Sequence, residues 1–301
     1  MKSILFIISS FRWGGINVAL QSLLKQIDPE EVKVDIFVMV HSGNYENKFD
    51  NCTILPKNYF VDALIDHARL KKGITKLVSG GMKILNKLTK DRFQHWVFKV
   101  VGNHLASQKR YDAVIGWHEG VPTTFVSHIN HPNKIAWIHC DYANYTDTPY
   151  ERDYYNKLQT VVCVSEYTRG TFLNFYPELE SRTRCIYNIL DVDGIKAKAL
   201  EPVTEDFKTD KFTIISVGRV SPVKQFSKIP EIARKVADAG CNFIWYILGP
   251  TYPGAEYDSL MANLDRYDVG DYVKLLGGKD NPYPYIAKSN LLVSTSLSES
   301  W

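Results

Sequence analysis

Apolar positions along the chain alternate between short continuous runs and longer stretches with helical spacing. The runs in the first part of the chain predict strands at residues 3–9, 33–39, 112–117, 134–139, 160–165 and 184–188. Helical spacing predicts helices at residues 15–27, 119–129, 150–157 and 166–176. Strands that are apolar at nearly every position are typical of a parallel sheet covered on both faces, so we expect an α/β fold.

The same alternation restarts after a polar stretch. Residues 191–211 contain few large apolar side chains, and we interpret them as a linker. The following runs predict strands at 212–218, 242–249, 272–277 and 290–296, and helices at 225–239, 255–266 and 282–288. We therefore expect two α/β domains, at 1–195 and 205–301. The second has about four strands, where a doubly wound unit usually has about five or six.

Composition places the chain among globular proteins. It has 301 residues, of which 45% are apolar and 23% charged, enough for two cores. The five cysteines include no C-x-x-C pair, so we expect reduced thiols rather than a disulfide framework or a zinc site. The apolar start lacks a signal-peptide cleavage site, and no run reaches the ~18–20 residues that span a bilayer. We expect a cytoplasmic protein.

The net charge of +3 is unevenly distributed. Residues 69–110 contain eleven Lys or Arg and one acid, Asp91, so this segment carries +10 and the rest of the chain −7. Apolar residues alternate with its lysines at roughly helical spacing, namely Leu77, Ile84, Leu85, Leu88, Trp96, Val97 and Val100. A basic amphipathic helix predicts contact with an anionic membrane surface, and a solvated helical face is the alternative. No nucleic-acid-binding motif accompanies the charge, so we expect no nucleic acid partner.

Two glycines follow the first predicted strand. Gly14 and Gly15 lie where a loop turns into a helix. Paired glycines let the backbone approach a ligand closely, and a helix N-terminus offers free N–H groups to an anion. A tight turn without a ligand is the structural alternative. The sequence is not G-x-G-x-x-G, so the fingerprint of nicotinamide-dinucleotide binding is missing.

Two cations follow the strand that opens the second domain. The strand ends at Gly218, with Arg219 next and Lys224 five residues later. Ligands of α/β sheets bind at the carboxyl ends of parallel strands. Arg offers a bidentate fork and Lys a point charge, a combination that suits a diphosphate. A solvated basic loop is the alternative.

Histidines end two neighbouring predicted strands. His139 closes the strand at 134–139, and His118 with Glu119 follows the strand at 112–117. Each histidine is a candidate ligand-binding residue, with a purely structural role as the alternative. A D-x-D tripeptide at Asp191 and Asp193 lies in the expected linker, and we expect no metal site there.

Taken in order, these stretches resemble the GT-B glycosyltransferases, in particular the retaining enzymes of family 4 that build bacterial surface polysaccharides. The likeness covers essentially the whole chain. The family's Gly-Gly loop corresponds to Gly14 and Gly15, its strand ending in His to His139, and its "GR…K" motif to Gly218, Arg219 and Lys224. A later motif of the family corresponds to residues 275–299, "LLGGKDNPYPYIAKSNLLVSTSLSE", which includes Asn281 and Glu299.

The resemblance implies roles that spacing alone does not give. Two Rossmann-like domains would face a cleft, with a nucleotide-sugar donor, mostly a UDP-sugar, held by the second domain. Arg219 and Lys224 would bind the diphosphate in place of a metal. His139 and Glu299 would contact the transferred sugar. The Gly14–Gly15 loop, Gly218 and Asn281 would complete the donor site.

The predicted function is transfer of a sugar, with retention, to a lipid-linked or glycan acceptor at the inner face of a membrane. The family's second acid would lie at position 307, so the resemblance implies a C-terminally truncated chain with an incomplete second domain. We expect little or no activity from this chain alone. Two alternatives stay open: a nucleotide-sugar epimerase of the same architecture, and a non-catalytic binding or assembly partner.

Overall fold

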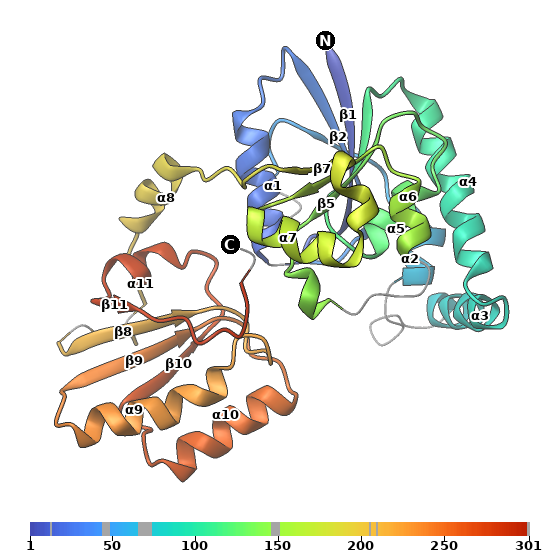
Figure 1. The fold of residues 1–301 in the computed structure, drawn as a ribbon. Coiled ribbons are helices and arrows are strands. Elements are labelled where there is room, and N and C mark those ends of the chain that lie inside the picture. The colour runs from blue at the N-terminus through green and yellow to red at the C-terminus, as the bar shows by residue number, and fades with distance from the viewer. Residues whose placement is uncertain are drawn as a thin grey trace. The chain divides into compact units, whose positions relative to one another are not determined.

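A computed structural model of the chain describes residues 1–12, 14–43, 49–65, 74–145, 151–204, 206–208 and 210–299. The described residues form two compact units (Figure 1), Met1–Leu190, here called unit 1, and Asp191–Glu299, called unit 2. Each unit is an α/β body built on its own parallel sheet. The α/β class predicted from the apolar runs is therefore confirmed.

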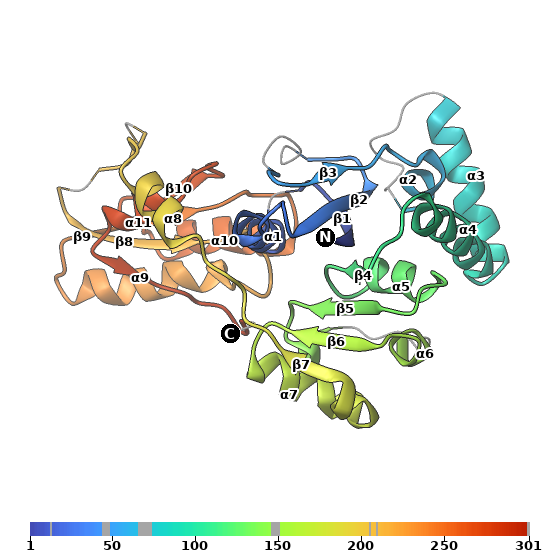
Figure 2. The same ribbon diagram turned by 90° about the horizontal axis from the view of Figure 1, so that it is seen from above.

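The sheet of unit 1 has seven parallel strands in the order β3-β2-β1-β4-β5-β6-β7 (Figure 2). Their bounds are β1 Lys2–Ser10, β2 Val32–Val40, β3 Thr53–Ile54, β4 Ala113–Gly116, β5 Lys134–Ile138, β6 Thr160–Cys163 and β7 Thr183–Cys185. β1 pairs with β2 on one side and with β4 on the other. The chain thus reverses its direction of winding at β1, and the carboxyl ends of β1 and β4 lie side by side at this switch point.

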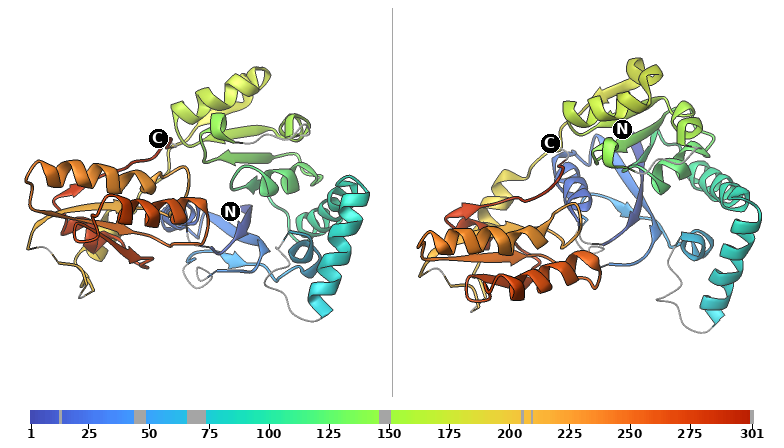
Figure 3. Two further views of the ribbon diagram at one scale, coloured as in Figure 1. Left: turned by 90° about the horizontal axis from the view of Figure 1, so that it is seen from below. Right: turned by 60° about the horizontal axis from the view of Figure 1, so that its bottom comes forward.

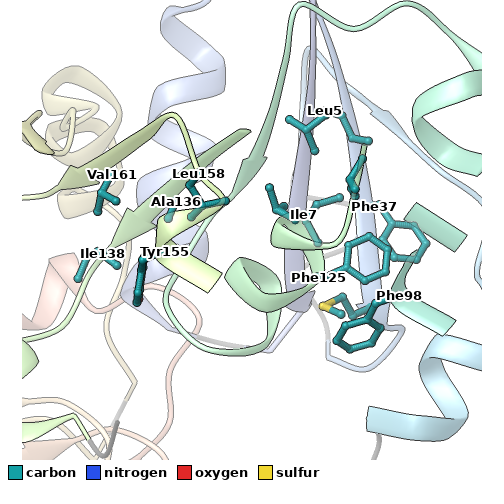
Figure 4. Packing of buried hydrophobic residues seen from close by; sticks show 14 of the residues in the cluster. Leu5, Ile7, Phe37, Phe98, Phe125, Ala136, Ile138, Tyr155, Leu158 and Val161 are labelled. Carbon is teal, nitrogen blue, oxygen red and sulfur yellow. The ribbon is translucent and has the colours of Figure 1, made fainter. Parts of the chain in front are cut away.

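Helices cover both faces of this sheet. They are α1 Gly15–Gln26, α2 Tyr59–Ile65, α3 Ile74–Leu88, α4 Arg92–Gln108, α5 Val121–Ser127, α6 Glu151–Asn156 and α7 Glu166–Phe175. Short 3₁₀ helices lie at Tyr142–Asn144 and Pro177–Arg182. On one face, Phe6 and Ile8 of β1 pack with Leu20 of α1. On the other, Leu5 and Ile7 join a cluster with Phe98 and Phe125 (Figure 4). Alternate residues of β1 are thus buried on opposite faces, which explains its continuous apolar run.

The basic segment predicted as one amphipathic helix forms two helices, α3 and α4, at the periphery of unit 1 (Figure 3). Residues 69–73 of that segment lie outside the described residues. Besides basic residues, several large apolar side chains stay exposed on the two helices, namely Leu77, Val78, Ile84, Leu85, Leu88, Trp96 and Val100. Val97 differs from the prediction, because it is buried in the core of unit 1 together with Phe98.

The sheet of unit 2 has four parallel strands in the order β10-β9-β8-β11. Its strands are β8 Phe212–Val217, β9 Phe243–Leu248, β10 Val273–Gly277 and β11 Leu291–Leu292. The helices of unit 2 are α8 Val192–Ala199, α9 Ile229–Asp238, α10 Ala255–Arg266 and α11 Tyr283–Ala287. A 3₁₀ helix, η5, lies at Phe226–Lys228. α9 and α10 pack on one face of the sheet, around Ile214 and Trp245. Tyr285 of α11 packs on the other face with Ile215 and Tyr246.

The expected linker over 191–211 contains a helix, which corrects that interpretation. Asp191 caps α8 by accepting a hydrogen bond from the backbone N–H of Gly194 (3.1 Å). α8 lies against α11, and Asn281 donates to the carbonyl of Lys198 (2.8 Å). None of the side chains of α8 is buried, because the helix is held by polar contacts at its two ends. Apolar periodicity therefore gives no signal for it.

No helix among the described residues is long and apolar enough to cross a bilayer.

The central strands of unit 1 are joined to the segment before β4 by a buried polar contact. Tyr111 donates its hydroxyl hydrogen to Asp35 of β2 (2.6 Å), and Lys109 pairs with the same carboxylate oxygen (3.1 Å). Asp35 is 6% exposed and Tyr111 also 6% exposed. A buried carboxylate that loses a hydrogen-bond donor keeps its desolvation cost without compensation.

We expect Tyr111→Phe to lower the free energy of unfolding by about 1.5–3 kcal/mol, because the hydroxyl donates to a charged acceptor. Chemical denaturation followed by circular dichroism measures this change. Tyr59→Phe is the matched control, since the Tyr59 side chain is exposed, and its effect should stay within about 0.5 kcal/mol. Equal stabilities of the two variants would show that the Asp35 contact contributes nothing.

Candidate functional site

The Gly14–Gly15 loop connects β1 to α1. Gly14 is the N-cap residue of α1, and no side chain caps this helix. Asn17, in the first turn, donates both amide hydrogens back to the loop, to the carbonyls of Ser10 (3.0 Å) and Arg12 (2.7 Å). Trp117 donates its indole N–H to the carbonyl of Ile16 (2.9 Å). The side chains of Asn17 and Trp117 therefore fix the loop and the first turn of α1 by hydrogen bonds to backbone carbonyls. The N–H groups at the start of α1 have no side-chain acceptor from the described residues.

Gly14 and Gly15 are not required by packing within the chain. A Cβ atom built on either glycine meets no described atom within 4 Å. Gly14 is in an extended conformation that any residue can adopt. The open space above the two glycines is consistent with the predicted close approach of a ligand, and the uncapped helix start beneath it favours an anion.

His118, Glu119 and His139 come together at the carboxyl ends of β4 and β5. The Glu119 carboxylate accepts the backbone N–H of His139 (2.9 Å). The His139 ring lies against Trp117, with ring centroids 4.9 Å apart. Burial, together with the nearby His118, lowers the pKa of His139 to about 3. His139 is therefore neutral at physiological pH and suited to hydrogen bonding rather than to carrying charge.

In unit 2, three glycines lie at the carboxyl ends of the neighbouring strands β8, β9 and β10, where the backbones approach closely. The N–H of Gly218 donates to Leu248 (2.9 Å), and the N–H of Gly249 donates to Gly277 (2.9 Å). A Cβ atom on Gly249 would lie 1.8 Å from the carbonyl oxygen of Gly218. Only glycine fits at position 249, because the Gly218 backbone crosses directly above it. This contact fixes the start of the loop that carries Arg219 and Lys224.

Lys224 forms an ion pair with Glu299 across this loop. The ammonium nitrogen of Lys224 lies 2.6 Å from Glu299 Oε1. The lysine stem packs over Gly218, since a Cβ there would lie 3.5 Å from Lys224 Cε. The segment that carries Glu299 is held against the loop by Thr295, which donates to the Lys224 carbonyl (2.7 Å). The structure thus brings two residues that were predicted separately, a cation and an acid distant in sequence, into direct contact.

The electrostatics of Glu299 follow from this contact. Partial burial alone would raise the pKa of Glu299, but the hydrogen bonds from Lys224 and Ser296 outweigh it, so the pKa lies below its usual range. The ion pair is therefore intact at neutral pH. A ligand that binds here meets a carboxylate beside an ammonium group.

Arg219 completes the cation pair and remains available. Its side chain is exposed, and within the described parts of the chain no hydrogen bond or ion pair engages its guanidinium. Arg219 lies directly after Gly218, whose position is fixed by Gly249. The fork of its guanidinium is free to bind a phosphate group from solvent.

Asn281 is placed differently from the other predicted donor-site residues. Its amide nitrogen donates to the Lys198 carbonyl and to Glu201 (both 2.8 Å), and its amide oxygen accepts the N–H of Tyr283 (3.1 Å). All of these partners belong to α8, the turn after it, or α11. In the structure Asn281 therefore fastens α8 to α11, and its assignment to the donor site stays a prediction.

Among the described residues, no three His, Cys, Asp or Glu side chains gather as metal ligands. Asp191 of the D-x-D tripeptide is used as the cap of α8.

Sequence reasoning missed Asn17 and Ser9. Asn17 holds the Gly14–Gly15 loop, and Ser9 hydrogen-bonds His118. A polar residue inside the predicted helix 15–27 was a usable signal for Asn17, because an asparagine at a largely buried position needs partners. Ser9 gave no signal, since its partner is distant in sequence.

No protein-family model matches the chain. The chain is 30% identical over 205 residues to a Campylobacter jejuni enzyme, N-acetylgalactosamine-N,N'-diacetylbacillosaminyl-diphospho-undecaprenol 4-alpha-N-acetylgalactosaminyltransferase. The match covers 60% of this chain and 53% of the enzyme. The chain spans about half the length of the curated relatives that it matches.

Two solved structures are similar over nearly the whole chain. Staphylococcus aureus TarM, determined with UDP, matches with a TM-score of 0.68 and 14% identity, covering 100% of this chain and 82% of TarM. Anabaena HepE, in complex with UDP and glucose, matches with a TM-score of 0.64 and 14% identity, covering 99% of this chain and 75% of HepE. The predicted GT-B fold and the resemblance to family 4 glycosyltransferases are confirmed.

The Lys224–Glu299 contact predicts a specific titration behaviour. The lowered pKa of Glu299 means that the pair contributes stability at neutral pH and loses it as the pH falls through that pKa. In Lys224→Met, partial burial stays but the main hydrogen bond is lost, so the pKa of Glu299 should rise. Carboxyl-carbon NMR titration of the two proteins measures the difference.

Lys228→Met serves as the control for this titration, because Lys228 is exposed and follows the same loop. It should leave the Glu299 midpoint unchanged. If the midpoint stays the same in Lys224→Met, the ion pair does not form in solution.

Proposed function

We propose that this chain, which has the GT-B fold and resembles family 4, is the nucleotide-sugar-binding part of a glycosyltransferase. The observation that carries the proposal is the cluster of Arg219 and Lys224, on the glycine-fixed loop after β8, with Glu299, on the segment after β11 that is held against this loop. A diphosphate needs cations, and a sugar needs hydrogen-bond acceptors for its hydroxyls. This cluster offers both at one edge of unit 2.

The donor is a UDP-sugar in this proposal. UDP is bound in the similar TarM and HepE structures, which supports this choice of nucleotide. Arg219 and Lys224 hold the diphosphate and stabilise the charge that develops as the nucleotide leaves. Glu299 accepts hydrogen bonds from the sugar hydroxyls. His139, neutral at physiological pH, is also assigned to hydrogen bonding with the transferred sugar.

Transfer proceeds with retention. The acceptor oxygen attacks the anomeric carbon on the face from which the diphosphate leaves, and the acceptor proton passes to the departing phosphate oxygen. This route requires no nucleophilic side chain. What it requires is stabilisation of the leaving diphosphate, which the two cations supply.

The acceptor is a lipid-linked sugar in this proposal. The similar Campylobacter enzyme carries a diphospho-undecaprenol acceptor in its name, which supports a lipid-linked substrate here. Unit 1 would bind the acceptor, with the Gly14–Gly15 loop near phosphate groups. The enzyme would then work at the cytoplasmic face of a membrane.

The membrane contact is assigned to α3 and α4. On α3, lysines at positions 76, 83 and 87 form a row with helical spacing, and apolar residues at the next positions form a second row, Leu77, Ile84 and Leu88. Each of these apolar side chains is more than 60% exposed. The opposite side of the helix is anchored, since Ser79 donates to the Ala63 carbonyl (2.6 Å). An anionic lipid surface satisfies both rows at once.

We expect Arg219→Ala and Lys224→Ala each to weaken UDP binding at least about tenfold, since each removes a charge-assisted contact with the diphosphate. Lys224→Ala should have the larger effect, because it also leaves Glu299 unpaired beside the anion. Isothermal titration with UDP measures both. Lys228→Ala removes an exposed charge near the same loop and should have little effect.

Unchanged UDP affinity in both variants would refute the diphosphate assignment. Incubation with UDP-sugars but no acceptor separates the alternatives. Conversion of one UDP-sugar to its epimer would identify an epimerase.

For the membrane contact, we expect the double variant Lys76→Gln, Lys87→Gln to weaken vesicle binding about thirtyfold, at about 1 kcal/mol per cation near an anionic surface. Sedimentation with vesicles of phosphatidylglycerol and phosphatidylcholine measures the affinity. The control is Lys196→Gln, Lys274→Gln, which removes two exposed charges of unit 2. Equal binding of both double variants would rule out α3 as the contact.

A further inference from the structure

Ser9 and His118 form a hydrogen-bonded pair at the switch point of the unit 1 sheet. β1 and β4 are neighbours, and the N–H of Trp117 extends their pairing by donating to the Ile7 carbonyl (3.0 Å). One step further along both strands, Ser9 Oγ lies 2.7 Å from His118 Nε2. Each of the two residues is partly exposed.

The direction of this hydrogen bond is fixed by the other ring nitrogen. His118 Nδ1 lies 2.7 Å from the backbone carbonyl of Glu119. A carbonyl oxygen only accepts, so Nδ1 must carry the hydrogen. Burial lowers the pKa of His118, so the ring is neutral and Nε2 has no hydrogen. Ser9 is therefore the donor, and its hydroxyl hydrogen is held by His118.

The consequence is that Ser9 presents only lone pairs to a ligand. Glu119, which follows His118 in the chain, adds a carboxylate to this edge of the sheet, and this carboxylate accepts the N–H of His139 (2.9 Å). A group of acceptors without a free hydrogen repels a phosphate and attracts a hydroxyl or amide hydrogen. This is the opposite of the uncapped start of α1, where free N–H groups favour an anion.

We propose that Ser9, oriented by His118, binds a hydroxyl group of the acceptor sugar as a hydrogen-bond acceptor. The assignment rests on the proposed function in placing the acceptor on unit 1, and it adds the residue that recognises it. Ser9 is the binding group, and His118 is a positioning residue that keeps the serine hydrogen turned away from the ligand. The neighbouring start of α1 remains for phosphate groups.

The test uses methyl glycosides of glucose, galactose and N-acetylgalactosamine, titrated into the chain by NMR, with UDP as a separate ligand. For the glycoside that binds most tightly, each hydroxyl is replaced in turn by hydrogen or by fluorine. We expect one position at which removal of the hydroxyl weakens binding about tenfold, the effect of one hydrogen bond. Fluorine at that position should weaken it equally, because fluorine cannot donate a hydrogen.

The matched variants are Ser9→Ala and Ser10→Ala. Ser9→Ala should bind the parent glycoside about tenfold more weakly and lose its sensitivity to that one hydroxyl, whereas Ser10→Ala should behave like the unchanged chain. UDP affinity should be the same in all three. In His118→Leu the serine hydrogen is released, so the fluorinated glycoside should regain affinity relative to the deoxy compound.

Three results would overturn the inference: no glycoside binding by the unchanged chain, full deoxy sensitivity in Ser9→Ala, or a fluorinated glycoside that binds as well as its parent. Failure of the donor proposal looks different. If UDP does not bind while the glycoside results come out as expected, the donor assignment fails and the Ser9 site stands.

Discussion

The parallel direction of every strand is the constraint on which both units depend. Because each strand runs the same way, all carboxyl ends lie at one edge of their sheet, and polar residues that are distant in sequence meet there. In unit 1 this brings the end of β1 next to the ends of β4 and β5, more than a hundred residues later in the chain. In unit 2 it brings Gly218, Gly249 and Gly277 together. The strands must be apolar on both faces to be covered by helices, so their ends are where polar chemistry can be placed.

The two edges are built for different chemistry. In unit 2 the backbone fixes the loop, through the close approach of Gly218 to Gly249, and the charged side chains extend from it toward solvent. In unit 1 the side chains of His118 and Glu119 are themselves fixed, because each hydrogen-bonds to a backbone group of the same edge. Cations on a rigid loop suit a diphosphate, whereas oriented hydrogen-bonding side chains suit the directional hydrogen bonds of a sugar.

The sequence predicted the parts of this arrangement that depend on local pattern. The strands β1, β2, β8 and β9 were recognisable because both of their faces are buried. The apolar pattern does not predict β3, and it predicts a strand at 290–296 where β11 has only two residues. Two residues of pairing leave no periodic signal in the sequence. Helix α8 was read as a linker, because polar caps rather than a buried face hold it. Within the candidate site, the position of His118, His139, Arg219 and Lys224 at the carboxyl ends of strands could be predicted from the spacing of these residues relative to the apolar runs.

What spacing could not give is which side chains touch. Arg219 and Lys224 were an equivalent pair in the sequence, but in the structure one is paired with Glu299 and the other is exposed. Asn281 belonged to a motif, yet its partners lie on α8 and α11. The contacts of Lys224 with Glu299 and of Asn281 with Lys198 span more than seventy residues, and no local pattern encodes them.

The Lys224–Glu299 pair also bears on how quickly an anionic ligand is captured. At neutral pH the two charges cancel at distances beyond the contact itself, so within this cluster only Arg219 projects a net positive field into solvent. Electrostatic steering depends on that net field. The association rate of a nucleotide should therefore fall with ionic strength as for one cation, even though two cations hold the bound molecule. The association rate of the nucleotide is thus governed by Arg219 alone, whereas its dissociation rate is governed by both cations.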